Sequence, residues 1–149
     1  MPAIQSVTRA LFLAFAVGAG TAAGADPAGS DAILRTEIER IARWRLYFGH
    51  QSVGDNLLEG IKDLSRSVGV AVNIASAPAA SGVGPATLGH VRVPENGKPL
   101  QKLEAFDRAM GTQSAGLDVA LVKFCYVDIG PDTDVKSLFA RYRATLADL

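Results

Sequence analysis

The sequence has a single cysteine and no excess of either charge. Cys125 cannot form a disulfide within the chain, so stability must come from an apolar core. Lys plus Arg and Asp plus Glu number 15 each, a balance that gives no sign of a nucleic-acid surface or an acidic tail. With 149 residues, of which 48% are hydrophobic and 20% charged, the composition indicates one globular domain.

The longest uninterrupted apolar run of the sequence lies near its amino terminus. Arg9 precedes the apolar residues 10–19, and the small residues Ala23-Gly24-Ala25 follow them. This order is typical of a secretory signal peptide over residues 1–25, so we expect a secreted or periplasmic bacterial protein. The alternative is a membrane anchor, but the run falls short of the roughly 20 residues that span a bilayer. No membrane association is expected after cleavage.

Apolar spacing in the remainder predicts alternating helices and strands. Residues 26–31 are turn-rich and are predicted to be a linker, and Asp31 is expected to cap the first helix. The run 117–127 is almost continuously apolar, which favours a strand buried on both faces. Residues 75–97 are predicted to be a long connection. Helices are expected over 32–42, 53–67, 98–110 and from Asp134 onward, and strands over 45–48, 70–74 and 117–127.

This alternation predicts an α/β domain over residues 32–149, with a parallel sheet between two helical layers. Three strands make a small core with two exposed edges. The sequence also stops within an amphipathic helix. We therefore expect these residues to form the amino-terminal strands of a larger sheet.

Ligands of open parallel sheets bind beyond the carboxyl ends of the strands. Three segments meet this condition, residues 49–54, 75–96 and 125–134, and they are expected to converge. They hold both histidines and most of the other reactive side chains. The candidate site residues are Gly49, His50, Gln51, Ser52, Gly54, His90, Asn96, Tyr126 and Asp128.

Ser52 is the strongest of these candidates because it lies between a strand and the first turn of a helix. A helix amino terminus stabilises negative charge, and α/β hydrolases place their serine nucleophile at such a turn. Ser52 as a simple helix cap is the alternative. His50 is expected either to act on Ser52 or to bond a backbone carbonyl.

The other candidates also have two interpretations each. Tyr126 and Asp128 are expected to contact substrate, although Asp128 would also suit a turn cap. His90 faces the cleft or lies on a surface loop. A metal site from His50, His90 and Asp128 lacks supporting spacing, so no metal is predicted. The glycines match neither a phosphate loop nor a dinucleotide fingerprint, and no cofactor is expected.

The stretch Tyr47 to Asn56 (YFGHQSVGDN) resembles the first block of the SGNH (GDSL-like) hydrolase superfamily, in particular a bacterial subgroup with a Gly-His-Gln-Ser-Val-Gly signature. Residues 121–128 are similar in position to the third block. The resemblance implies a flavodoxin-like or SGNH-like three-layer sheet with Ser52 as nucleophile. It also implies hydrolysis of a small-molecule or carbohydrate ester.

The sequence departs from the family pattern at three places. Gly-His-Gln-Ser replaces Gly-Asp-Ser, and the third block has no Asn before Asp128, which leaves Asn96 as a substitute oxyanion donor. The late Asp-x-x-His of the family has no counterpart, so the general base is not identified. A non-catalytic ligand- or carbohydrate-binding module and an inactive fragment are the alternatives. The oligomeric state is left open.

Overall fold

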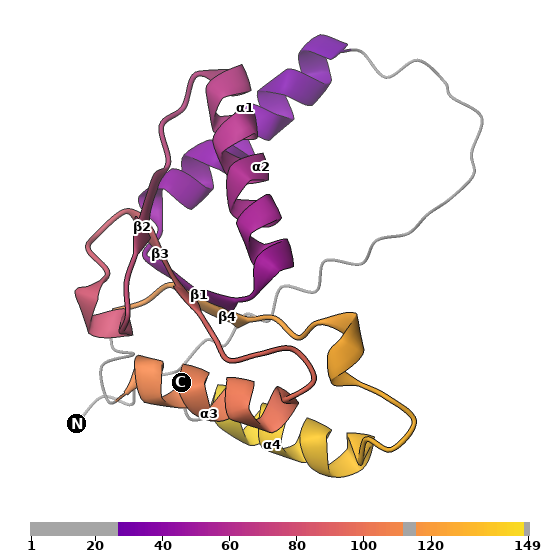
Figure 1. The fold of residues 1–149 in the computed structure, drawn as a ribbon. Coiled ribbons are helices and arrows are strands. Elements are labelled where there is room, and N and C mark those ends of the chain that lie inside the picture. The colour runs from indigo at the N-terminus through magenta and orange to yellow at the C-terminus, as the bar shows by residue number, and fades with distance from the viewer. Residues whose placement is uncertain (1–26, 112–115, 148–149) are drawn as a thin grey trace, which may run out of the picture.

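Four parallel strands form one sheet, with helices on both faces (Figure 1). The computed structural model describes residues 27–111 and 116–147. The predicted α/β fold class, with a parallel sheet between two helical layers, is confirmed. The strands are β1 (Leu46–His50), β2 (Asn73–Ser76), β3 (Thr87–Arg92) and β4 (Val119–Val122), and the helices are α1 (Pro27–Arg43), α2 (Ser52–Val68), α3 (Pro99–Met110) and α4 (Val135–Ala147), with two short 3₁₀ helices, η1 (Ala80–Gly82) and η2 (Tyr126–Asp128).

The sheet contains one strand more than the sequence predicted. The strand order is β2-β3-β1-β4, and β3 lies inside the segment 75–97 that was expected to be a connection. The alternation of apolar and polar residues that predicts a strand is interrupted in β3 by Gly89, because glycine has no apolar side chain. A Cβ on Gly89 would lie 2.3 Å from the Val83 side chain, so glycine is needed for the segment around η1 to pack on the sheet.

The strand expected to be most buried is instead a short edge strand. β4 covers only Val119–Val122 of the predicted 117–127, and it pairs only with β1 among the described strands. Leu121 is 51% exposed. The apolar residues that follow leave the sheet and lead into η2. Their hydrophobicity was therefore wrongly interpreted as burial within the sheet.

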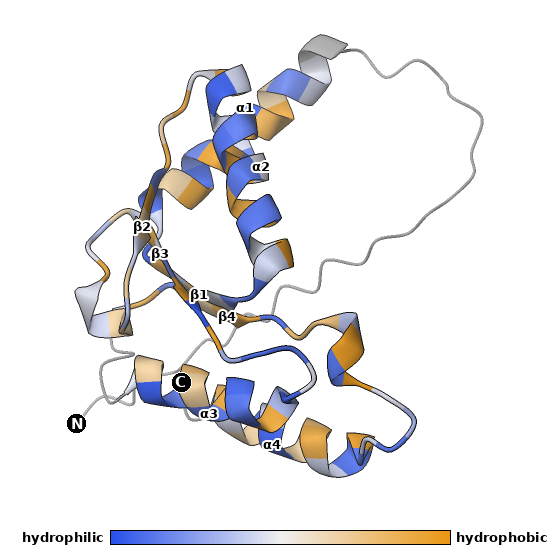
Figure 2. Cartoon of the chain, in the orientation of Figure 1, coloured by the Kyte–Doolittle hydropathy of each residue, from blue (hydrophilic) through white to orange (hydrophobic). Residues whose placement is uncertain are grey.

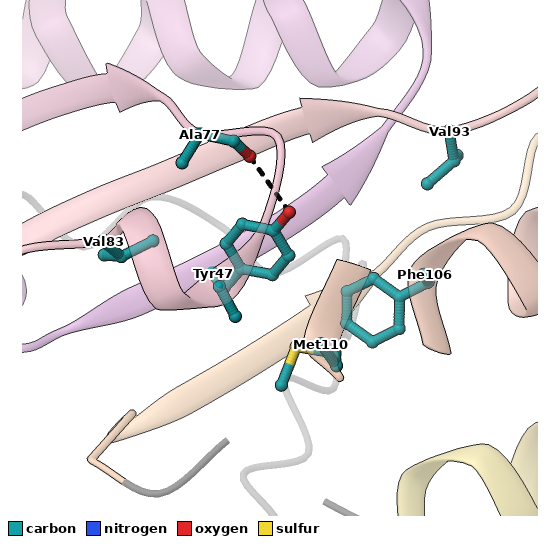
Figure 3. Close-up of a cluster of buried hydrophobic side chains, with 7 residues drawn as sticks. Tyr47, Ala77, Val83, Val93, Phe106 and Met110 are labelled. Atoms are coloured by element: carbon teal, nitrogen blue, oxygen red, sulfur yellow. Dashed lines mark hydrogen bonds between the residues drawn. The ribbon is translucent and has the colours of Figure 1, made fainter. Parts of the chain in front are cut away.

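Alternating residues of β1 build two apolar cores, one on each face of the sheet. Leu46 and Phe48 pack with Leu58 of α2, beneath α1 and α2. Tyr47 packs with Phe106 of α3 on the opposite face (Figure 3). Its hydroxyl donates a hydrogen bond of 3.0 Å to the Ala77 carbonyl, and burial raises the pKa of Tyr47 to about 12, so the donor stays protonated.

The helix ends differ in how well the sequence predicted them. Asp134 caps α4, as expected, by accepting the backbone N–H of Ser137 at 3.0 Å. α1 begins at Pro27, so it includes Asp31 and most of the predicted linker. The predicted signal peptide lies outside the described residues. Within the described part of the chain, no helix has the length and hydrophobicity needed to cross a membrane.

Candidate functional site

The carboxyl ends of three strands meet around β1. The His50 carbonyl accepts the N–H of Val93, which follows β3, at 2.9 Å. The Gly49 carbonyl accepts the N–H of Lys123, which follows β4, at 3.0 Å. α2 leaves β1 on one face, whereas α3 connects β3 to β4 across the other face (Figure 1). Such a reversal of winding marks the crevice where open α/β sheets bind ligands.

Ser52 is the first residue of α2 and is exposed to solvent. Gln51, with extended backbone, occupies the N-cap position, so Ser52 is not the cap. The first turn of a helix has unpaired N–H groups and a partial positive charge, which favour an anion beside the Ser52 hydroxyl. In residues 27–111 and 116–147, no hydrogen bond connects this hydroxyl to an imidazole.

His50 and His90 form a pair on adjacent strands. His50 ends β1 and is fully buried, whereas His90 of β3 is half-buried. Nε2 of His50 lies 3.0 Å from Nδ1 of His90, and Nδ1 of His50 lies 3.0 Å from the Gln51 carbonyl oxygen. The His50 ring also stacks on Phe48, with centroids 5.0 Å apart. His50 therefore belongs to the strand, although the sequence placed it on a turn.

The contacts of this pair assign its protons. A carbonyl oxygen only accepts, so Nδ1 of His50 carries hydrogen and donates to Gln51. Nε2 of a neutral His50 then accepts, and Nδ1 of His90 donates to it. This arrangement leaves the lone pair of His90 on Nε2. The two rings thus form a directed chain of hydrogen bonds that ends at the turn before Ser52.

The surroundings keep His90 neutral. Burial lowers the pKa of His90 below its ordinary value of 6.5, and the positive charge of a protonated His50 would lower it further. Asp55 opposes this shift, and its carboxylate is paired with Arg92 at the end of β3. At neutral pH the imidazole of His90 is therefore a base rather than a cation.

Three residues of the stretch 47–56, Gly49, Gln51 and Gly54, have packing roles. The side-chain amide of Gln51 donates to the carbonyls of Val93 and Pro94, which joins the ends of β1 and β3. A Cβ on Gly49 would lie 2.7 Å from Phe106. A Cβ on Gly54 would lie 2.2 Å from Cβ of His50, so the first turn of α2 can approach the strand only with glycine there.

Asp128 is enclosed by the chain. Its side chain forms an ion pair of 2.6 Å with Lys102 of α3, and both side chains are 0% exposed. Its carboxylate also accepts the backbone N–H groups of Gly97 and Cys125. Burial raises the pKa of Asp128, but the hydrogen bonds from Lys102, Cys125 and Gly97 outweigh it and hold this pKa below 3.8. In this structure Asp128 has no surface for substrate.

Asn96 contacts the same ion pair but is itself exposed to solvent. Its side-chain oxygen accepts a hydrogen bond of 2.8 Å from the Lys102 ammonium. The predicted oxyanion donor is thus hydrogen-bonded to Lys102 of α3, and no hydrogen bond in the described structure joins it to Ser52. Tyr126, by contrast, is 88% exposed at the start of η2. Cys125 is a half-buried free thiol.

The three residues considered for a metal are not brought together. His50 and His90 pair on the α2 face, whereas Asp128 pairs with Lys102 of α3. Within the described ranges, no group of three or more His, Cys, Asp and Glu side chains is suited to a metal ion.

Sequence reasoning missed Asp55, Arg92 and Lys102. Asp55 was identifiable as an acidic residue in the first turn of a predicted helix, a position that favours negative charge. Arg92 was hidden because β3 was not predicted. Lys102 lies within the predicted helix 98–110 and is buried beside Leu103, but nothing in the local sequence indicated a carboxylate partner.

Comparisons of this chain with protein-family models, with curated proteins and with solved structures gave no match. The function is therefore inferred from the sequence and the structure of this chain.

Proposed function

We propose that this protein is an exported hydrolase that cleaves small-molecule or carbohydrate esters with Ser52 as nucleophile. One observation carries the proposal. Ser52 is exposed on the first turn of the helix that directly follows β1, at the carboxyl edge of a parallel sheet. The resemblance of residues 47–56 to the SGNH first block supports the same residue, and the signal-like residues 1–25 support export.

The chemistry would follow the usual course of acyl transfer. The Ser52 oxygen attacks the ester carbonyl, and the first-turn N–H groups of α2 stabilise the resulting oxyanion. The bond to the alcohol then breaks, and the alcohol leaves with a proton. Water hydrolyses the remaining acyl-serine to release the acid. A base must accept the Ser52 proton, and among the described residues no imidazole is bonded to Ser52.

That missing contact favours a second candidate, a non-catalytic binding module on the same scaffold. The two histidines bond each other and the backbone instead of Ser52. A fold of this class hosts many functions, so binding without turnover is compatible with it. The two candidates differ in one measurable property, the nucleophilicity of Ser52.

A fluorophosphonate probe tests this property directly. We expect the full chain to be labelled at Ser52, as located by peptide mass spectrometry, and to hydrolyse p-nitrophenyl acetate. Ser52→Ala should abolish both signals. Ser67→Ala is the matched control, because Ser67 is exposed near the opposite end of the same helix. Equal labelling of wild type and Ser52→Ala would refute the nucleophile, and ligand-induced stabilisation without labelling would favour the binding module.

A further inference from the structure

A large apolar groove runs along the edge of β4 with which no other described strand pairs. Its volume is about 790 Å³, within the range of pockets that hold small organic ligands. α2 contributes Leu57 and Ile61, and α4 contributes Phe139 and Tyr142. Figure 2 shows hydrophobic segments in both α2 and α4, and Ile129, which follows η2, also lines the groove. The groove thus joins both faces of the sheet around its edge.

The apolar side chains of this groove are left open to solvent. Leu121 is 51% exposed, Ile129 is 50% exposed and Phe139 is 58% exposed. Contiguous exposure of this kind is typical of ligand grooves and of interfaces, because single exposed apolar residues are common but lined grooves are not.

One cation lies among these apolar residues. Lys123 lines the groove and is half-buried, and its ammonium donates one hydrogen bond, of 3.0 Å, to the Phe124 carbonyl. No Asp or Glu lines the groove, and within residues 27–111 and 116–147 no carboxylate forms an ion pair with Lys123. An ammonium has three donors, so this side chain can still bind an anion. An apolar groove with a single cation is complementary to an amphipathic anion.

We propose that the groove binds the anion of a fatty acid, with its alkyl chain between α2 and α4 and its carboxylate on Lys123. A second copy of the chain fits less well. A two-fold contact over the same groove would bury the Lys123 ammonium of both copies in one apolar interface, which is costly without an acidic partner. The site does not involve Ser52, so it stands independently of ester hydrolysis.

Binding of dodecanoate to the full chain, measured by calorimetry, tests the proposal. We expect saturable binding with one site, and affinity should rise about threefold to fourfold with each methylene from octanoate to dodecanoate. Lys123→Gln should weaken dodecanoate about tenfold and leave dodecanol unchanged. Lys136→Gln is the matched control, because Lys136 is exposed on α4 and does not line the groove.

Further measurements separate the remaining explanations. Ser52→Ala should bind dodecanoate as wild type does, whatever the outcome of the hydrolase test. If Lys123→Gln fails to fold, the wild-type preference for dodecanoate over dodecanol still tests the charge contact. No saturable binding, equal affinity for dodecanol, or a dimer in light scattering that dodecanoate cannot dissociate would each overturn the proposal.

Discussion

His50 and His90 are joined by a hydrogen bond of 3.0 Å between Nε2 of the first ring and Nδ1 of the second. The bond spans the two central strands of the sheet, β1 and β3. Because the other nitrogen of His50 is bonded to the Gln51 carbonyl, the pair fixes the turn that positions Ser52. A proton added to Nε2 of His50 would remove the acceptor of this bond, whereas a proton added to Nε2 of His90 would leave the bond in place.

The pair predicts a pH-dependent stability. The folded-state pKa of His90 lies below its ordinary value of 6.5, so the unfolded chain binds this proton more readily. We therefore expect the free energy of unfolding to fall as the pH drops below about 6.5, until His90 is protonated in the folded state as well. Urea denaturation at several pH values measures this. His90→Gln should flatten the profile in that range, and an unchanged slope would contradict the assignment.

The ion pair between Lys102 and Asp128 predicts a large loss of stability when one partner is removed. Both side chains are fully buried, so Asp128→Ala leaves an unpaired ammonium inside the protein. We expect a loss of about 3–5 kcal/mol in the free energy of unfolding. Asp107→Ala is a suitable control, since its 3.5 Å ion pair with Arg141 is exposed and should contribute about 0–1 kcal/mol. Similar losses for both variants would contradict the structure.

Replacing glycine by alanine is expected to change the free energy of unfolding in opposite directions at two positions of α2. Gly54→Ala would place a methyl group 2.2 Å from Cβ of His50, so we expect a loss of about 1–3 kcal/mol or more. Gly60→Ala has nothing within 4 Å of the new Cβ and should gain about 0.5–1 kcal/mol from helix propensity. Thermal and urea unfolding compare the two, and a stable Gly54→Ala variant would show that α2 does not lie this close to β1.

Ser52→Ala should leave stability almost unchanged. The side chain is exposed and does not cap α2, so we expect a change within about 0.5 kcal/mol. Circular dichroism and urea unfolding of the purified variant measure this. A large destabilisation would indicate that Ser52 is structural, and the loss of probe labelling would then no longer identify a nucleophile.

The amino-terminal segment predicts cleavage on export. The full chain, including residues 1–25, can be expressed in a bacterial host that has a periplasm. We expect this to yield a mature protein that begins at Asp26. Mass spectrometry of periplasmic and cytoplasmic fractions measures the amino terminus. Ala23→Arg and Ala25→Arg together should block processing, because signal peptidases require small residues there. Unprocessed wild-type protein confined to the cytoplasm would contradict the prediction.

The local patterns of the sequence were sufficient for the fold class. Apolar residues at helical spacing located α2, α3 and α4, and the β1 and β4 regions were recognised from their apolar runs. β3 was missed because Gly89 replaces the larger apolar residue that a strand pattern needs. The edge position of β4 was missed because hydrophobicity does not distinguish a buried strand from one beside an open groove.

The sequence by itself determined the α/β class and the place of Ser52 between a strand and a helix, because the formation of each helix and strand follows largely from the spacing of apolar residues close together in the chain. Only the tertiary structure decided that His50 bonds His90, that Asp128 is enclosed by Lys102, and that an apolar groove surrounds Lys123. Each of these contacts joins residues far apart in the chain or on different elements. Strand order and the choice of sheet face place them together, and neither is encoded in local periodicity.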